Sequence, residues 1–455
     1  MTAPLSPGAA AASSASAHWV TAWSAAPQGP STLASAGAET FSGYEYTLAA
    51  QRLVLPPRTF SNETVRQIMH LHYGGDAVRV QLSNEFGTGP VSFPSVSLGQ
   101  RAGDTGAAVA DGTLRQVTFR GSPSVTIPRG ERVLSDPVHL PVEPFEDAVL
   151  SIFVPEGNGA ATVHGNAQQT FYTAAGDVTA EQAGSAFLPR GIAATPYTAT
   201  ATTAYYYATD IQVATHPEAR TLVTLGDSIT DGFFSSGDAN SRYPDVLARR
   251  LLGDPGTDHL SVANQAISGS RVVRDGTGPS ILDRLEREVF SRPNVGGVIY
   301  LHGINDFGTA GGQLPVATAQ EVIDGYREVA ARMHARGIPI YLSTLLPSGD
   351  VLKPVPYGTY STPDTNAKRS QVNQWIRTEG RTVFDGVIDL DLVVRDPLFP
   401  EHLALRFDSG DSLHPNDAGY AAIAEAVSLE MSSLEMSRGS PGTSRVRARG
   451  AGTPS

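Results

Sequence analysis

The hydrophobic pattern of the chain changes near residue 216, and this change restricts the possible fold more than any other feature. Before it, short segments rich in β-branched residues are separated by Pro and Gly, without a helical period. After it, apolar runs alternate with segments of helical period. The first pattern is typical of a sandwich or barrel, and the second of a parallel α/β sheet. A length of 455 residues also favours two domains. We therefore expect an N-terminal β-rich domain at 18–216 and an α/β domain at 217–436.

The first block contains several candidate strands. The segments 65–73 and 77–83 alternate apolar and polar residues on either side of Gly74-Gly75-Asp76, which predicts a β-hairpin. Further strands are expected at 116–119, 124–127, 138–142 and 148–154. Together these segments predict an all-β sandwich or jelly-roll-like domain.

The second block predicts a doubly wound parallel sheet. Buried strands are expected at 221–225, 260–267, 297–301, 338–345 and 383–390. Helices are expected at 244–252, 281–290, 319–335, 366–377 and 416–429. Sheets of this kind bind ligands at the carboxyl ends of their strands, so residues that follow the strands are the first candidates for a site.

The two ends of the chain differ from both blocks. Residues 1–17 are rich in Ala, Ser and Pro and lack the basic and apolar regions of a signal peptide, which as written indicates a cytoplasmic protein. The small residues at 10–17 nevertheless resemble the end of such a peptide, so secretion stays open if the true start lies upstream. Residues 1–17 are therefore expected to be either disordered or the remnant of a targeting segment. Residues 437–455 lack periodicity and are expected to be disordered.

The composition excludes several classes of partner. A net charge of −12 disfavours nucleic acid and anionic membranes, because both require a basic surface. No apolar run reaches the roughly 18 residues of a transmembrane helix. The absence of cysteine excludes disulfides, thiolate metal sites and a cysteine nucleophile.

Ser228 is the most informative residue at a strand end. It lies in the segment GDSITDG at 226–232, directly after the expected strand 221–225. A serine there presents its hydroxyl at the edge of the sheet where ligands bind, although an isolated serine in such a turn is more often a helix cap. Serine is a poor nucleophile at neutral pH unless a base is adjacent, so the interpretation depends on a partner.

The segment DSLHP at 411–415 supplies that partner. His414 titrates in the range needed of a base, and Asp411 can fix its tautomer and stabilise the imidazolium. A single DxxH is weak evidence, because a histidine before a helix is commonly structural. Together with Ser228 in one α/β domain, the segment predicts a Ser–His–Asp triad.

Two further strand ends offer hydrogen-bond donors for a developing oxyanion. Gly269, in ISG at 267–269, offers a backbone N–H, and Asn305, in GIND at 303–306, offers a side-chain amide. Each such donor is typically worth about 10²–10³ in rate. Taken alone, Gly269 is a turn glycine and Asn305 an Asx-turn residue.

In this order the four segments resemble the sequence blocks of the SGNH hydrolases, the GDSL lipase/esterase superfamily. The resemblance covers nearly all of the second block and implies a flavodoxin-like sheet with strand order 2-1-3-4-5. It implies that Ser228, Asp411 and His414 form the triad. It also implies that the oxyanion hole consists of Ser228, Gly269 and Asn305.

The flanking sequence resembles a bacterial branch that carries an added N-terminal β domain. In the second block this likeness rests on the segments at 242–250 and 414–420, and in the first block on HWVTAW at 18–23 and LSNEFG at 82–87. One departure from the superfamily is Gln265-Ala266, where relatives often have small residues and a further glycine. This departure leaves Gly269 in place and is expected to alter the pocket wall.

The expected activity is hydrolysis of a carboxylic ester through an acyl-enzyme on Ser228, without a metal or cofactor. The expected substrate is a small-molecule or carbohydrate-linked ester. The triad alone does not distinguish hydrolysis from acyl transfer to an alcohol or amine, so an acyltransferase is an alternative. A carbohydrate-binding protein with a vestigial hydrolase domain is another. Its sugar-stacking residues would be Trp19, Trp23 and the tyrosines at 205–207, although such aromatic residues are more often core.

Several other features have structural interpretations. Asp227, Asp231 and Asp306 are expected to hold loops by hydrogen bonding. His70 and His72 share a strand face without a recognisable third metal ligand, so they are expected to be structural. Neither HExxH nor GxSxG occurs, which disfavours a zinc hydrolase and the nucleophile elbow of α/β-hydrolases. The segment 347–364 is either a lid or a plain surface loop.

Overall fold

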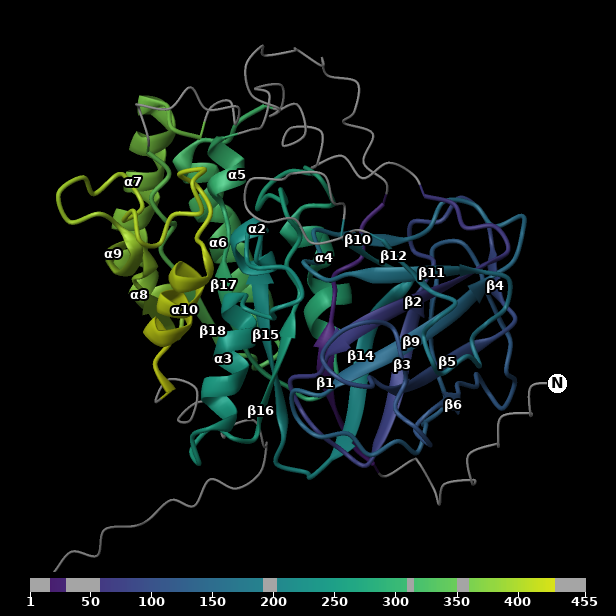
Figure 1. Ribbon diagram of the computed structural model, residues 1–455. Coiled ribbons are helices and arrows are strands. Elements are labelled where there is room, and N and C mark those ends of the chain that lie inside the picture. The colour runs from purple at the N-terminus through teal and green to yellow at the C-terminus, as the bar shows by residue number, and fades with distance from the viewer. Residues whose placement is uncertain (1–16, 30–57, 191–202, 309–314, 350–359, 430–455) are drawn as a thin grey trace, which may run out of the picture.

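The computed structural model describes residues 17–29, 58–190, 203–308, 315–349 and 360–429 (Figure 1). Antiparallel sheets occupy the described residues 17–215, which we call the β region. A parallel sheet with helices occupies the described residues 220–429, which we call the α/β region. The expectations for residues 1–16 and 437–455 lie outside the described residues. No helix in the described part of the chain is long and apolar enough to cross a membrane.

The β region is built on two larger antiparallel sheets. One has the order β1-β14-β3-β8, and the other the order β12-β11-β2-β9-β5-β6. The strands of the first sheet are β1 (His18–Ser24), β14 (Ala208–Thr215), β3 (Ala77–Ser83) and β8 (Arg132–Leu134). Those of the second are β12 (Leu188–Arg190), β11 (Phe171–Ala175), β2 (Glu63–His70), β9 (Asp147–Val154), β5 (Val96–Gln100) and β6 (Arg115–Gln116). Two small pairs complete the region: β10 (Val163–Gly165) with β13 (Ala204–Tyr206), and β4 (Val91–Phe93) with β7 (Val125–Ile127).

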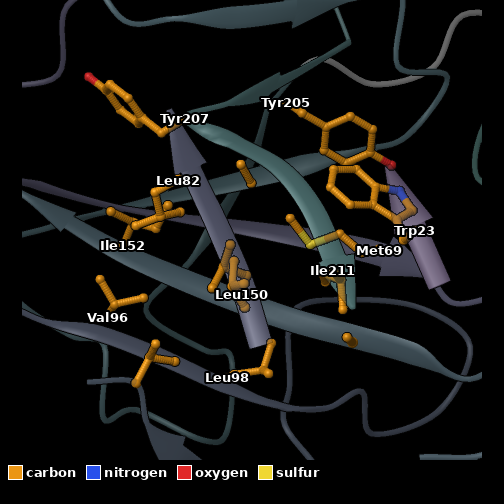
Figure 2. Packing of buried hydrophobic residues seen from close by; sticks show 14 of the residues in the cluster. Trp23, Met69, Leu82, Val96, Leu98, Leu150, Ile152, Tyr205, Tyr207 and Ile211 are labelled. Carbon is orange, nitrogen blue, oxygen red and sulfur yellow. The ribbon is translucent and has the colours of Figure 1, made fainter. Parts of the chain in front are cut away.

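Alternate residues of the strands fill one core between the two sheets (Figure 2). Val78, Val80 and Ile211 contribute from the first sheet, whereas Met69 and Leu150 contribute from the second. All five are fully buried. Apolar alternation on strands of two facing sheets is the basis of a β-sandwich, in agreement with the prediction for this block.

The predicted hairpin at 65–83 is wrong. Strand β2 pairs with β9 and β11, whereas β3 pairs with β14 and β8, so the two strands lie in different sheets. The connecting glycines allow the backbone to pass close to β14: a Cβ on Gly75 would lie 2.3 Å from the carbonyl oxygen of Ala214. The same alternation and the same glycines therefore suit a crossing between sheets as well as a hairpin.

The segment 138–142 also differs from its prediction. It forms isolated bridges, Val138 with Val78 and Val142 with Gly75, and no strand. Pro137 and Pro141 lack the backbone N–H that a ladder requires, which explains why pairing does not propagate.

The aromatic residues considered as sugar-stacking platforms lie in the core. Trp23 and Tyr205 are about 5–6 % exposed, and their ring centroids are 4.7 Å apart in an edge-to-face arrangement (Figure 2). Tyr207, 1 % exposed, packs edge-to-face on Phe93 at 4.9 Å. Stacking on a sugar requires an exposed ring face, so these side chains contribute to packing instead.

The α/β region contains a five-stranded sheet of order β16-β15-β17-β18-β19, and every pairing in it is parallel. In chain order this is 2-1-3-4-5, so the flavodoxin-like prediction is confirmed. The strands are β15 (Arg220–Gly226), β16 (Leu260–Asn264), β17 (Val295–Leu301), β18 (Ile340–Ser343) and β19 (Gly386–Ile388). The expected strand 383–390 is shorter than predicted, because α8 (Gly380–Val383) and α9 (Leu390–Val394) occupy its ends.

Helices cover both faces of this sheet (Figure 1). Strand β15 shows the division, because Leu222 packs with one set of helices, whereas Val223 and Leu225 pack with the other. The first face carries α3 (Tyr243–Leu252), α9 and α10 (Asp417–Ala426). The second carries α4 (Ile281–Leu285), the π-helix η3 (Glu286–Phe290), α6 (Ala319–His334) and α7 (Pro363–Arg377). Two short helices, α2 (Ser228–Asp231) and α5 (Ile304–Phe307), begin at the carboxyl ends of β15 and β17.

Strand β1 joins the β region to β15 and to the edge strand β16. The backbone N–H of Thr21 donates to Oγ1 of Thr221 at 3.1 Å, and Oγ of Ser261 donates to the Thr21 carbonyl at 2.6 Å. Nearby, the Arg292 guanidinium lies 2.9 Å from a carboxylate oxygen of Asp210, and both side chains are 1 % exposed. The two regions therefore share a buried interface that contains charge.

We predict that Arg292→Met destabilises the protein by about 3–5 kcal/mol, because it leaves the Asp210 carboxylate buried without its cation. The double variant Arg292→Met/Asp210→Asn should recover part of this loss. Urea unfolding followed by fluorescence measures the free energy of unfolding of each variant. The exposed pair Arg332–Glu328 provides the control, since Arg332→Met should cost less than about 1 kcal/mol. Equal losses for Arg292→Met and Arg332→Met would contradict the prediction.

Candidate active site

Ser228 lies where β15 ends and α2 begins. The turn before it is tight, because a Cβ on Gly226 would lie 2.3 Å from the carbonyl oxygen of Leu301 on β17. Asp227 caps the helix, and its Oδ1 accepts the N–H of Ile229 at 3.1 Å. Glycine and the capping aspartate thus place the Ser228 side chain at the carboxyl edge of the sheet.

Ser228, His414 and Asp411 form a continuous hydrogen-bond chain. Oγ of Ser228 is 2.8 Å from Nε2 of His414, and Nδ1 of His414 is 2.5 Å from Oδ2 of Asp411. Ser228 is 6 % exposed and His414 4 %. Of the residues expected at the site, these three are brought into direct contact.

The loop that carries His414 folds around the Asp411 carboxylate. Oδ1 of Asp411 accepts the backbone N–H groups of Leu413 and His414 at 2.9 and 2.7 Å. Burial alone raises the pKa of Asp411, but the adjacent His414 and these hydrogen bonds outweigh it, so the pKa is lowered. An ionised Asp411 accepts the Nδ1–H of His414, which leaves Nε2 to accept the proton of the Ser228 hydroxyl.

Two aromatic residues after α2 pack against the imidazole of His414. The ring centroid of Phe233 lies 4.8 Å from that of His414 in an edge-to-face arrangement, and that of Phe234 lies 5.7 Å away. The Tyr420 hydroxyl donates to the Phe233 carbonyl at 2.6 Å, which ties this segment to α10. The imidazole is therefore held by packing as well as by Asp411.

Gly269 lies in the turn after β16, beside the turn of Ser228. Its φ is +77°, in the left-handed region that favours glycine. Both of its flanks bind Gly226: the Ile267 N–H donates to the Gly226 carbonyl at 3.2 Å, and Oγ of Ser270 donates to it at 3.3 Å. The sequence-predicted glycine thus lies next to the segment that carries Ser228.

Asn305, in α5, is oriented by bonds to both ends of its amide. Its Nδ2 donates to the Ser270 carbonyl at 3.1 Å, and its Oδ1 accepts the Tyr360 hydroxyl at 2.6 Å. Because Nδ2 carries two protons, the bond to Ser270 leaves one for another acceptor. Asn305 and Gly269 are therefore linked through Ser270.

The other aspartates of these segments accept hydrogen bonds from loops. Asp306 accepts the N–H groups of Val272 and Val273 at 2.8 and 3.1 Å. Burial raises the pKa of Asp306 to about 6 and that of Asp227 to about 7. In both cases the loss of hydration outweighs the backbone hydrogen bonds that favour the ionised form.

His70 and His72 bind different partners and do not form a shared metal site. Nδ1 of His70 is 2.8 Å from Asp147, whereas the His72 ring bonds the Val262 carbonyl at 2.8 Å and Asp245 at 2.9 Å. Within the described ranges, no cluster of three His, Cys, Asp or Glu side chains is suited to a metal ion. Both rings are engaged in the structural contacts described.

Sequence reasoning missed three contributors to the site. Phe233 and Phe234 directly follow GDSITDG, so the sequence indicated that they lie near Ser228. Nothing in the sequence indicated their contact with His414. Tyr360 belongs to the segment 347–364, most of which lies outside the described residues; nothing in its sequence context indicated a bond to Asn305.

Comparison with known proteins gives a family match and several structural similarities. Residues 224–422 match the model of the GDSL-like lipase/acylhydrolase family. A search of curated proteins finds no match.

Three solved structures illustrate the structural similarities. A GDSL-like lipase from Bacteroides thetaiotaomicron VPI-5482 is 14 % identical, with 47 % of this chain and 88 % of that chain covered and a TM-score of 0.33. The acetyl xylan esterase AlAXEase is 20 % identical, with 45 % and 96 % covered and a TM-score of 0.36. An active-site mutant of a family two carbohydrate esterase from Clostridium thermocellum is 14 % identical, with 81 % and 90 % covered and a TM-score of 0.32.

We predict that Asp227 makes stability depend on pH. Because burial raises its pKa from 3.8 to about 7, the folded protein binds this proton more tightly than the unfolded chain does. The resulting contribution to stability is present below pH 4 and is lost as pH rises to about 7, by at most about 1.4 kcal/mol per pH unit. Asp227→Asn, which cannot titrate, should therefore gain stability relative to wild type between pH 4 and pH 7.

Urea unfolding of both proteins at pH 4, 5.5 and 7 measures this difference in the free energy of unfolding. Asp324→Asn, at an exposed position on α6, controls for the removal of one negative charge. A difference between Asp227→Asn and wild type that stays constant over this pH range would show that folding does not raise the pKa of Asp227.

Proposed function

We propose that the chain is a serine esterase with Ser228 as its nucleophile, and the match of residues 224–422 to the GDSL-like lipase/acylhydrolase family model supports this proposal. The observation that carries the proposal is the buried chain from Ser228 through His414 to Asp411. A hydroxyl, an imidazole and a carboxylate in this order are what nucleophilic attack on an ester requires.

In the first half of the proposed reaction, His414 accepts the proton of Ser228 as its oxygen attacks the ester carbonyl. Nε2 is already 2.8 Å from the Ser228 oxygen, within the range of direct proton transfer. Asp411 keeps the imidazole in the tautomer with a proton on Nδ1 and stabilises the imidazolium that forms. His414 then protonates the leaving alcohol, and the acyl group remains on Ser228.

The developing oxyanion is assigned three donors: the backbone N–H groups of Ser228 and Gly269 and the amide of Asn305. The left-handed turn at Gly269 and the oriented amide of Asn305 support this assignment. Donors that are fixed before the reaction require no reorganisation when charge develops, which is why such groups contribute strongly to rate. Tyr360 helps to fix the Asn305 amide, because its hydroxyl donates to Oδ1 and so keeps Nδ2 on the opposite side of the amide.

In the second half, water attacks the acyl-enzyme, with His414 as the general base. Ser228, His414 and Asp411 serve both halves of the reaction, so neither a metal nor a cofactor is needed in the scheme.

The substrate class that we propose is a small-molecule or carbohydrate-linked carboxylic ester. A panel of acyl p-nitrophenyl esters of increasing chain length, together with acetylated sugars, resolves the class. The products identify hydrolysis if free acid accumulates in the presence of an added alcohol acceptor.

We predict that Ser228→Ala lowers kcat on a short p-nitrophenyl ester by roughly 10⁴–10⁶-fold, because no acyl-enzyme can form. The circular dichroism spectrum and the unfolding midpoint should stay close to those of wild type. Ser236→Ala, on an exposed serine eight residues later, is the control and should keep wild-type activity. Wild-type turnover by Ser228→Ala would disprove the proposed nucleophile.

We predict that Asn305→Ala lowers kcat by about 10²–10³-fold with little change in KM, because an oxyanion donor acts mainly in the transition state. Tyr360→Phe removes only the bond that orients the amide, so a smaller loss of roughly tenfold is expected. Steady-state kinetics on the same ester measure both. If Asn305→Ala raises KM and leaves kcat intact, the amide binds the substrate and does not stabilise the oxyanion.

A further inference from the structure

Two buried histidines of the β region contact aspartates of the α/β region, and the proposed mechanism uses neither. His164, on β10, is 3.0 Å from Oδ1 of Asp231 through its Nε2. His72, after β2, is 2.9 Å from Oδ1 of Asp245 through its Nε2. Both imidazoles are at most about 7 % exposed, and both carboxylates 3 %. The two pairs have similar chemistry, but they reach different elements: His164 reaches α2, and His72 reaches α3.

Asp231 connects the helix of Ser228 to the turn of Gly269. It is the last residue of α2, three positions after Ser228. Its second oxygen, Oδ2, accepts the backbone N–H of Ser268 at 3.1 Å and the Ser268 hydroxyl at 2.6 Å. Ser268 directly precedes Gly269, so this carboxylate links the helix of the nucleophile to the turn of a proposed oxyanion donor.

The other side of Ser268 is also held from the β region. The Ser268 carbonyl accepts the hydroxyl of Thr277, whose own carbonyl accepts the side-chain amide of Gln28 at 3.1 Å. Gln28 in turn accepts the Gly165 N–H at 3.1 Å, next to His164 on β10. Strand β10 therefore reaches both sides of the residue before Gly269.

The His164 ring itself has a fixed orientation. Its Nδ1 bonds the Ala26 carbonyl at 2.9 Å, and its face stacks on Tyr205 with ring centroids 6.3 Å apart. The bonds to Ala26 and Asp231 engage both ring nitrogens. A ring that is held on both nitrogens and on one face provides a rigid anchor for the Asp231 carboxylate.

We propose that His164 is a positioning residue for ester hydrolysis. Through Asp231 it holds the turn of Gly269 at the distance from Ser228 that the oxyanion requires. The inference rests on the proposed function, and it assigns the β region a part in the active site. Displacing a catalytic group by about 1 Å can lower the rate by about 10²-fold, so a contact outside the reacting atoms affects kcat.

Two conservative variants separate the bonds of His164. Asparagine places an amide nitrogen near the position of Nδ1, so His164→Asn keeps the bond to Ala26 and loses the bond to Asp231. Glutamine reaches the position of Nε2, so His164→Gln keeps the bond to Asp231. We expect His164→Asn to lower kcat about ten- to hundredfold with KM within about twofold, and His164→Gln to stay within about threefold of wild type.

The pair His72–Asp245 provides the matched control. His72→Asn keeps the bond to the Val262 carbonyl and loses the bond to Asp245, as His164→Asn does at the other pair. The two Asn variants should lower the thermal unfolding midpoint by similar amounts, while kcat falls only for His164→Asn. Equal losses of kcat would show that any weakening of the interface lowers activity, which would overturn the proposal.

Ser268→Ala tests the same path without disturbing the buried His164–Asp231 pair. It removes the hydroxyl bond to Asp231 and should lower kcat several-fold. If His164 and Ser268 act through one carboxylate, the double variant His164→Asn/Ser268→Ala should lose less than the product of the two single losses. Losses that multiply would show independent effects and would also overturn the proposal.

These outcomes are distinguishable from failure of the proposed function. If Ser228→Ala is inactive while His164→Asn keeps wild-type kcat and KM, the nucleophile stands and the role of His164 does not. If Ser228→Ala keeps wild-type activity, the assignment of the reaction itself is wrong, and with it the role of His164.

Discussion

The contact between Gly226 and strand β17 is the constraint on which the site depends. No side chain fits at Gly226, because a Cβ would lie 2.3 Å from the Leu301 carbonyl. The chain can therefore turn directly from β15 into α2, and Ser228 points out of the sheet edge. The Gly226 carbonyl then accepts bonds from both flanks of the Gly269 turn. One close approach of two strands thus places the serine and the glycine in register.

Around this point the α/β region buries several carboxylates close together, and each is stabilised differently. Asp411 is next to the imidazole of His414, which lowers its pKa despite burial. Asp227 and Asp306 have mainly backbone N–H donors, and burial raises the pKa of both. The imidazole and the backbone donors together outweigh the loss of hydration at Asp411, whereas the groups around Asp227 and Asp306 do not. This difference suits a triad, in which only the orienting carboxylate must stay ionised near neutral pH.

The parallel sheet could be predicted, because apolar runs alternate with segments of helical period. The order of its strands followed from the four segments, GDSITDG, ISG, GIND and DSLHP, that resemble the SGNH hydrolases. The contact of Ser228 and Asp411 with His414 could also be expected, because each of the three residues lies beside an element whose period is clear. The failures have a physical cause as well. The glycines at 74–75 suit a hairpin and a crossing between sheets equally, so local alternation left the partner of β2 undetermined. His164 and Tyr360 are single residues whose role comes from contacts 67 and 55 positions away in the chain.

These distant contacts bear on what the β region does. An appended binding module needs only a small contact with its neighbour, because interfaces between the domains of one chain commonly resemble transient ones. Here the described part of the interface contains three buried pairs of a basic and an acidic side chain: Arg292–Asp210, His72–Asp245 and His164–Asp231. Buried pairs of this kind are seldom a net source of stability, because desolvation offsets the attraction, but separating the partners leaves a buried charge without compensation. An interface that selects one geometry, and that touches α2 directly, is suited to holding the active-site turns in place.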